Sequence, residues 1–181
     1  MPNRHYDADW IAMTLERLAD EIAANRTFGG HKALVGLRTR GAILADRLRA
    51  LLARKGVDMA IGYLDATVYR DDLHTQAGLR PIGETALPFE IKDADIFLVD
   101  DVLSTGRTIR AAMEALFSHG RPACVRLCVM LDRGGRQLPI HADFTGSTVE
   151  IPKGGWVRLK LSEIDPQGDA VFVVAPGDAE P

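Results

Sequence analysis

The chain has 181 residues, of which 46% are hydrophobic and 26% charged, and its formal net charge is −3. This size and balance predict one globular domain with a sizeable core. The first ten residues lack the apolar core of a signal peptide, no apolar run approaches the ~20 residues that cross a bilayer, and the slight acidity gives no overall attraction to polyanions. We therefore expect a cytoplasmic protein that binds neither membranes nor DNA.

The first part of the chain alternates helical and strand patterns. Apolar residues recur at helical spacing from Ile11 to Ile22, and Asp7 or Asp9 can cap the start, which predicts an amphipathic helix. Residues 32–37 read as a short buried strand, 41–56 as a helix closed by Gly56, and 58–69 as a longer strand.

A polar segment, Arg70 to Pro88, then separates the two halves of the chain. It is long for a structureless connection inside a compact domain, and such loops often cover a binding site. We interpret it as a mobile lid.

The second part of the chain continues the alternation. A strand is predicted at Ile96 to Val99, a helix at 107–120 and a strand at 124–131, which is the rhythm of a parallel sheet with its site at the carboxyl ends of the strands. Cys124 and Cys128 would share one face of that last strand as buried free thiols. Segments 150–161 and 170–174 read as strands of a small cap, and 175–181 as a frayed tail.

The junction after the predicted strand at Ile96 carries the strongest chemical signal. Ser104 to Thr108 offer hydroxyls, a glycine and free amides at the start of a helix, which suits a phosphate monoester. Asp100 and Asp101 would repel a phosphate unless they face hydrogen-bond donors, such as the vicinal hydroxyls of a ribose. A ribose 5-phosphate fits both halves. The alternative is purely structural, with the acids ending a strand and the hydroxyls capping a helix.

The string IFLVDDVLSTGRT resembles the phosphoribosyl pyrophosphate (PRPP) signature of the type I phosphoribosyltransferases. LVGLRTRGAILADRL, YLDATVYRDD, GRPACVRLCVMLDRGGRQLPIHADFTG and VRLKLSEID are similar, in the same order, to segments of the PyrR family. That family comprises pyrimidine operon attenuators with uracil phosphoribosyltransferase activity. The resemblance implies one phosphoribosyltransferase domain over residues 1–181: an α/β fold with a central, mainly parallel sheet flanked by helices, a small cap (hood) and a mobile lid over about 70–88.

The resemblance also implies site residues. The two acids would bind the ribose diol, the loop after them the 5-phosphate, and the loop after the first core strand the diphosphate leaving group. The implied PRPP-binding residues are Arg38, Thr39, Arg40, Gly41, Asp100, Asp101, Val102, Leu103, Ser104, Thr105, Gly106, Arg107 and Thr108. Of these, Asp100, Asp101 and Arg40 would take part directly in catalysis. The alternative is that Arg38 and Arg40 are solvated surface charges and Gly41 a turn residue.

The implied reaction is displacement of diphosphate from C1 of PRPP by N1 of uracil, which gives UMP. Mg²⁺ would be held mainly by ligand oxygens, with Asp100 and Asp101 assisting. The implied lid residues are Arg70, Asp71, Asp72 and Arg80. A homodimer or a higher homo-oligomer is expected.

The base would be recognised by the loop after the strand at 124–131 and by the cap. The implied base-binding residues are Asp132, Arg133, Gly134, Trp156 and Val157. For Trp156 the alternative is a place in the core. His141 is expected to be structural or on the surface.

Attenuators of this family bind a messenger RNA hairpin through the first helix and the region after the DRG segment. Here the first helix carries the acids Glu16 and Asp20. In the second region the positive charges are those of Arg133, Arg136 and Lys153. Acids in the path of a phosphate backbone oppose binding, so we predict weak or absent RNA affinity. The alternatives are an RNA-binding attenuator that senses UMP or PRPP, and a phosphoribosyltransferase for another base such as hypoxanthine.

Overall fold

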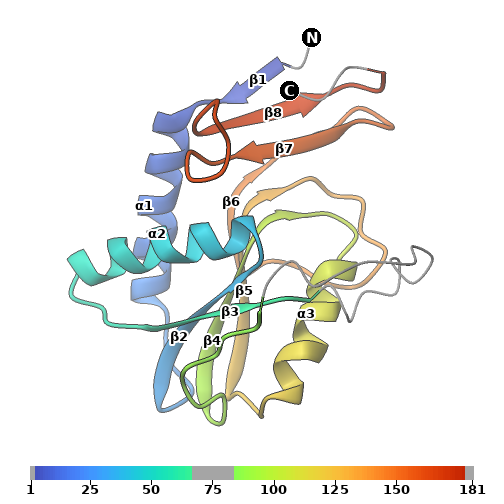
Figure 1. Cartoon of the computed structure of the whole chain (residues 1–181). Coiled ribbons are helices and arrows are strands. Elements are labelled where there is room, and N and C mark those ends of the chain that lie inside the picture. Colours follow the sequence, from blue (N-terminus) through green and yellow to red (C-terminus); the bar gives the residue numbers. More distant parts are fainter. Residues whose placement is uncertain (1–2, 67–83, 178–181) are drawn as a thin grey trace.

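The computed structural model describes residues 3–66 and 84–177. A parallel five-stranded sheet lies at its centre, in the order β3-β2-β4-β5-β6 (Figure 1). The strands are β2 (His31–Leu37), β3 (Ala60–Leu64), β4 (Ala94–Leu103), β5 (Cys124–Asp132) and β6 (Phe144–Thr148). The predicted α/β class and parallel sheet are confirmed.

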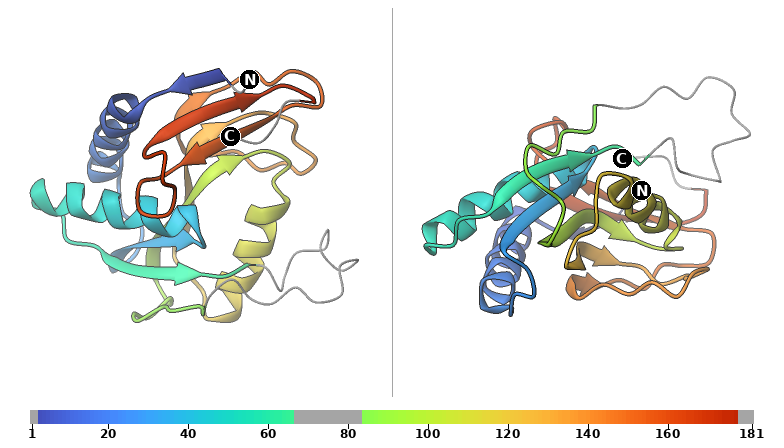
Figure 2. Two further views of the ribbon diagram at one scale, coloured as in Figure 1. Left: turned by 45° about the horizontal axis from the view of Figure 1, so that its top comes forward. Right: turned by 90° about the horizontal axis from the view of Figure 1, so that it is seen from below.

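Helices cover both faces of this sheet. Helices α1 (Ala8–Ala24) and α2 (Arg40–Arg54) lie on one face and α3 (Arg107–Ser118) on the other (Figures 1 and 2). The apolar stripe predicted for the first helix is buried, and the backbone N–H of Trp10 donates to Asp7 Oδ1 at 3.0 Å, so Asp7 caps it. Two apolar clusters result, one on each face of the sheet.

A second, antiparallel sheet forms the hood above the ends of these strands. Its order is β1-β8-β7, from β1 (Asn3–Tyr6), β8 (Ala170–Val174) and β7 (Trp156–Lys160). Leu159 and Val171 of the hood belong to the same apolar cluster as Ile11 and Leu44 of the two neighbouring helices. The predicted cap is therefore packed onto the main body.

Several elements differ from the sequence-based prediction. Strand β4 continues past Val99 to Leu103, because β5 offers partners as far as Asp132, so the two acids lie inside a strand. Strands β1 and β6 were not predicted. Both are short and polar, and they form because β8 and β5 supply free edges.

The segment predicted to be a lid falls mostly outside the described residues. Of its members, Arg70, Asp71, Asp72 and Arg80 lie there. The described end, residues 84–88, runs beside β3, where Ala86 and Tyr63 exchange two backbone hydrogen bonds of 2.8 Å. Cys128 is buried and Cys124 half-buried, and both thiols are free. None of the helices in the described part of the chain is long and apolar enough to cross a membrane.

Candidate active site

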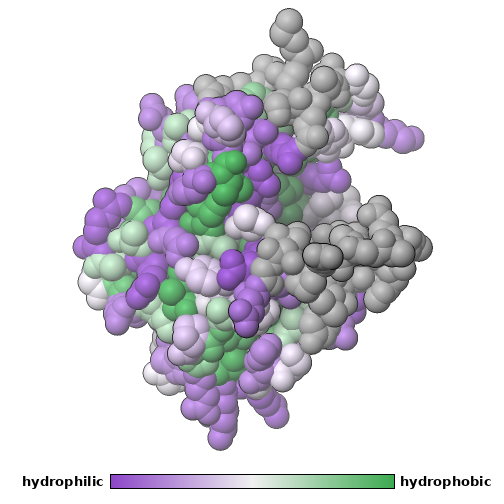
Figure 3. All heavy atoms as spheres, in the orientation of Figure 1, coloured by the Kyte–Doolittle hydropathy of each residue, from purple (hydrophilic) through white to green (hydrophobic). Residues whose placement is uncertain are grey.

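A cavity of about 520 Å³ lies between the hood and the carboxyl ends of the central strands. The space-filling view shows the surface indented at this level, below the three-stranded sheet (Figure 3). The lining residues are Arg40, Asp101, Val102, Trp156, Val157, Arg158 and Leu159. Residues predicted to bind PRPP and residues predicted to bind the base thus meet in one cavity.

Two of the lining residues were not predicted. Arg158 and Leu159 belong to β7, and the Arg158 guanidinium lies 5.8 Å from the centre of the Trp156 ring. Trp156 is half-buried at the edge of this cavity. The period-2 alternation of a strand, which puts Trp156 and Arg158 on one face, was the available signal for Arg158.

The acid pair stands at the end of β4. Asp100 is 8% exposed and Asp101 is half-buried. Asp100 Oδ1 accepts from the Asp101 amide, and Asp101 Oδ1 from the Val102 amide, both at 2.9 Å. Burial raises the pKa of Asp101 above its ordinary value, against the opposing effects of Asp100, Arg40 and the Val102 amide. Asp101 is a carboxylate held where its charge lacks water, which favours a cationic or hydrogen-donating ligand.

Gly41 lets the start of α2 approach this pair. A Cβ at Gly41 would lie 2.4 Å from the carbonyl oxygen of Val99 and 3.1 Å from Asp100 Cα. Real side chains do not come so close to a backbone, so the position requires glycine. The loop 38–41 is thereby pressed against the acid pair.

The loop after the acids, which was predicted to cradle an anion, leads directly into helix α3. Gly106 has φ +89° and is the N-cap of α3, so the cap itself offers no side chain, and the Arg107 amide at the start of the helix donates to Thr105 Oγ1 at 3.3 Å. The first turn contains no acid. Free amides at the positive end of a helix dipole bind anions, and glycine is needed at Gly106 because its backbone is left-handed.

Two arginines of the loop after β5 donate hydrogen bonds to Ser104 of this loop. Arg133 Nε donates to Ser104 Oγ at 2.8 Å, and Arg136 Nη1 to the Ser104 carbonyl at 2.8 Å. Because Ser104 Oγ accepts from Arg133, its own hydrogen remains available to a phosphate oxygen. Arg133 Nη1 also reaches the Gly155 carbonyl of the hood at 3.4 Å, so it links the cradle to the cap.

The predicted base-binding residues of the β5 loop lie beside the cradle. Asp132 pairs with Arg136 and accepts from the Gly134 amide at 2.9 Å. Burial acts to raise the pKa of Asp132, but these two partners outweigh it and hold that pKa below its ordinary value. Asp132, Arg133 and Gly134 do not line the cavity, whereas Trp156 and Val157 do.

The two arginines of the loop predicted to face the diphosphate have different surroundings. Arg38 does not line the cavity. Its Nε donates to the Glu84 carbonyl at 3.1 Å, and its guanidinium lies 5.2 Å from the centre of the Tyr63 ring. The Arg38–Thr39 peptide is cis. Arg40 lines the cavity, and its Nη2 donates to both carboxylate oxygens of Asp165 at 3.1 Å.

The residues present suit a magnesium ion shared with a ligand. Within the described residues, no group of three or more His, Cys, Asp or Glu side chains could hold a metal by itself. Asp100 and Asp101 offer hard carboxylate oxygens next to an anion cradle, and magnesium is usually bound by one or two carboxylates together with phosphate oxygens. The donor set therefore fits an ion that arrives with a phosphorylated ligand.

Comparisons with known proteins agree with this geometry. Residues 6–159 match the family model described as "Phosphoribosyl transferase domain". A "Bifunctional protein PyrR" from a Roseiflexus species is 46% identical over 169 residues, covering 93% of this chain and 92% of that protein. The Deinococcus radiodurans protein of the same name is 43% identical over 174 residues, covering 96% and 94%.

The fold is shared with solved structures of lower sequence identity. A Staphylococcus aureus hypoxanthine phosphoribosyltransferase has a TM-score of 0.70 at 17% identity, with 96% of this chain and 93% of that chain covered. The Trypanosoma cruzi hypoxanthine phosphoribosyltransferase has a TM-score of 0.71 at 18% identity, covering 96% and 97%. The chain has the type I phosphoribosyltransferase fold, and by its sequence it belongs to the PyrR family.

Proposed function

We propose that the protein transfers the phosphoribosyl group of PRPP to uracil, releasing diphosphate and forming UMP. The observation that carries the proposal is one cavity lined by Arg40 and Asp101 on the PRPP side and by Trp156 and Val157 of the hood on the other. Membership of the family makes the chain a phosphoribosyltransferase, and uracil is the base that the PyrR resemblance implies.

Three parts of the site would hold PRPP. The amides at the start of α3 and the Ser104 hydroxyl bind the 5-phosphate, while Asp100 and Asp101 accept hydrogen bonds from the ribose diol. Arg40 faces the diphosphate, whose charge matches a guanidinium. Magnesium bound with PRPP would supply positive charge to the leaving diphosphate.

These same groups act on the charges that develop as the bond at C1 breaks. Positive charge grows on the ribose, beside the acid pair, and negative charge grows on the diphosphate, beside Arg40. Fixed groups stabilise such charges more than mobile water does, because they need no reorganisation as the charges form. In this proposal the base binds under β7, where Trp156 lines the cavity.

The proposal is tested by diphosphate release from PRPP and magnesium with uracil and with hypoxanthine in parallel. We expect UMP with uracil and a far slower reaction with hypoxanthine. The double variant Asp100→Asn, Asp101→Asn should lose transfer in either case and remain folded by circular dichroism. Faster turnover of hypoxanthine would contradict the base assignment, and unchanged turnover in the double variant would contradict the role of the acids.

RNA binding is the second candidate function, because the relatives are named bifunctional. On the described surface, Glu16 lies 3.3 Å from Arg54 and 3.2 Å from Lys55, and Asp20 lies 2.7 Å from Lys55. The acids of α1 thus pair with cations at the C-terminal end of α2. Arg133 and Arg136 are already engaged around Ser104, so we propose that any RNA affinity of a single copy is weak.

Titration with the pyrimidine leader RNA of the source organism, at physiological salt, tests this second proposal. We expect binding no tighter than that of an unrelated hairpin. Sequence-dependent binding at or below ~10⁻⁸ M, the range of specific complexes, would show that the regulatory function is retained. We also propose that the protein forms a homodimer or a higher homo-oligomer, and analytical ultracentrifugation of the free protein measures that state.

A further inference from the structure

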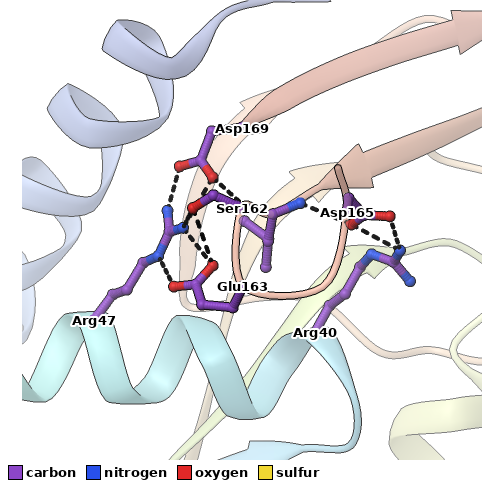
Figure 4. Close-up of polar contacts among 7 residues, drawn as sticks. Arg40, Arg47, Ser162, Glu163, Asp165 and Asp169 are labelled. Atoms are coloured by element: carbon purple, nitrogen blue, oxygen red, sulfur yellow. Dashed lines mark hydrogen bonds and ion pairs between the residues drawn. The ribbon is translucent and has the colours of Figure 1, made fainter. Parts of the chain in front are cut away.

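Helix α2 holds the loop between β7 and β8 at two points. Arg40 and Arg47 are seven residues apart, about two helical turns, and therefore lie on one face of the helix. Both side chains reach the Ser162–Asp169 loop of the hood (Figure 4). The two contacts differ in their relation to the cavity.

The Arg47 contact is distant from the cavity. Its guanidinium donates to Glu163 Oε1 and Oε2 at 2.8 and 2.7 Å and also pairs with Asp169. Arg47 does not line the cavity, and Glu163 is 43% exposed. This pair fastens the loop to the helix without touching the site.

The Arg40 contact is part of the cavity wall. Both carboxylate oxygens of Asp165 bond a single nitrogen, Nη2, so Asp165 does not occupy the other two nitrogens of the guanidinium. Nε is buried and has no hydrogen-bond partner within the described residues. An unpaired buried donor costs free energy, so this arrangement is poorly suited to a purely structural arginine.

Asp165 is itself fixed. Its side chain is 10% exposed, and its Oδ2 accepts from the Leu161 amide at 2.9 Å inside the turn that follows β7. Lys160 lies 3.8 Å from Oδ1. A free arginine side chain loses rotamer entropy when it binds a ligand, and an anchored carboxylate that already holds the guanidinium reduces that loss.

We infer that Asp165 is a positioning residue for Arg40, holding the guanidinium at the cavity wall where the diphosphate of PRPP binds. The inference rests on the proposed function, because it assigns Arg40 to the diphosphate. It places a determinant of diphosphate binding in the hood, 125 positions along the chain from the arginine that it orients. The hood then contributes to both ends of the reaction, the base side through Trp156 and the diphosphate side through Asp165.

The competing interpretation predicts a change of the opposite sign in anion affinity when Asp165 is removed. If Asp165 merely neutralised Arg40, its removal would free the cation and tighten anion binding. If it positions Arg40, its removal weakens binding although the site gains positive charge. The direction of the change therefore separates the two.

Calorimetric titration with magnesium diphosphate measures that direction without requiring turnover. We expect Asp165→Asn to weaken binding about tenfold, because a binding group displaced by even 1 Å loses much of its effect. Asparagine keeps an oxygen for the Leu161 amide, so the turn should fold. Asp165→Glu keeps the charge but moves it, and should also bind more weakly than the parent.

Two controls make the test specific. Glu163→Gln removes a charge from the same loop, and a contact to the same helix, without touching Arg40, so its affinity should equal the parent's. The double variant Arg40→Ala, Asp165→Asn should bind no more weakly than Arg40→Ala alone, because Asp165 acts through Arg40. Tighter or unchanged binding in Asp165→Asn, equal losses in Glu163→Gln, or losses that multiply in the double variant would each overturn the inference.

Steady-state kinetics separates this inference from the proposed function. In Asp165→Asn the KM for PRPP should rise while the KM for the base stays constant, whereas a loosened hood would raise both. A parent protein that binds magnesium diphosphate but does not transfer to uracil would contradict the proposed base. The titration would still decide the role of Asp165.

Discussion

The ionised form of Asp101 is the form proposed to bind ligand, and it is also the form that lowers the stability of the fold. Burial of the Asp101 carboxylate raises its pKa, even though Asp100, Arg40 and hydrogen bonds from backbone amides act against the shift. The folded state therefore holds a proton on Asp101 more tightly than the unfolded state does. The stability due to this proton is present below the unfolded pKa and is lost as pH rises through the folded pKa.

Asp101→Asn should therefore stabilise the free protein at neutral pH, by on the order of 1 kcal/mol, while abolishing transfer. Urea unfolding of parent and variant measures the difference, which should shrink as pH is lowered below the folded pKa. A variant less stable than the parent at neutral pH would contradict the account.

The same shift predicts the pH dependence of ligand binding. Ionised Asp101 is the form that accepts from a diol or approaches magnesium, so PRPP affinity should rise with pH through the raised pKa. Calorimetry of magnesium PRPP binding in buffers of different ionisation enthalpy should detect proton release. Asp101→Asn should bind weakly and without that release.

At the scale of elements, the proposed phosphate cradle depends on a neighbouring loop as well as on its own residues. Helix α3 supplies the amides, but the conformation of the loop before it is held by Arg136, which donates to Ser104 and Ile140 carbonyls at 2.8 and 2.7 Å and pairs with Asp132. These contacts are half-buried. A binding loop held in this way is organised before its ligand arrives.

Arg136→Lys should disorganise the cradle, because a lysine cannot supply three directed contacts. We expect a loss of stability of roughly 1–3 kcal/mol from the unmet partners and a raised KM for PRPP. Arg54→Lys is the matched control, since its partner Glu16 is exposed and its own side chain is 69% exposed, and it should change neither quantity. Equal effects in the two variants would contradict the bracing role.

For the whole molecule, attachment of the hood to α2 should depend on pH. The Arg47 guanidinium holds the pKa values of Glu163 and Asp169 below their ordinary range. When folding lowers the pKa of an acid, its contribution to stability is present above the unfolded pKa and is lost as pH falls through the folded pKa. Acid should therefore weaken the attachment of the hood before it affects the apolar core.

Arg47→Met tests this in the intact chain. Its midpoint of acid unfolding, followed by tryptophan fluorescence, should lie at higher pH than that of the parent. Methionine replaces the apolar stem of arginine without its charge, so the substitution removes the ion pairs and keeps an apolar side chain at this position of α2. An unchanged midpoint would show that the ion pairs contribute nothing to holding the hood. The attachment would then rest on the apolar cluster that the hood shares with α1 and α2. The same shared cluster supports our proposal that residues 1–181 act as one domain.

The sequence by itself determined the features whose signals are local. The apolar residues from Ile11 to Ile22 recur at helical spacing and lie in α1. The contiguous string from Asp100 to Thr108 contains both the acid pair and the loop before α3. The family followed from the same kind of local string. Periodicity, capping and a short loop can be read from adjacent residues because their physical causes act between adjacent residues.

Only the tertiary structure decided which distant residues share the cavity. Arg38 and Arg40 are two positions apart, yet one contacts Glu84 and the other Asp165. Arg133, predicted to recognise the base, braces Ser104 instead of lining the cavity. Side-chain partners of this kind depend on how the hood packs over the sheet, and that packing is set by the whole apolar cluster, which no single segment of the sequence contains.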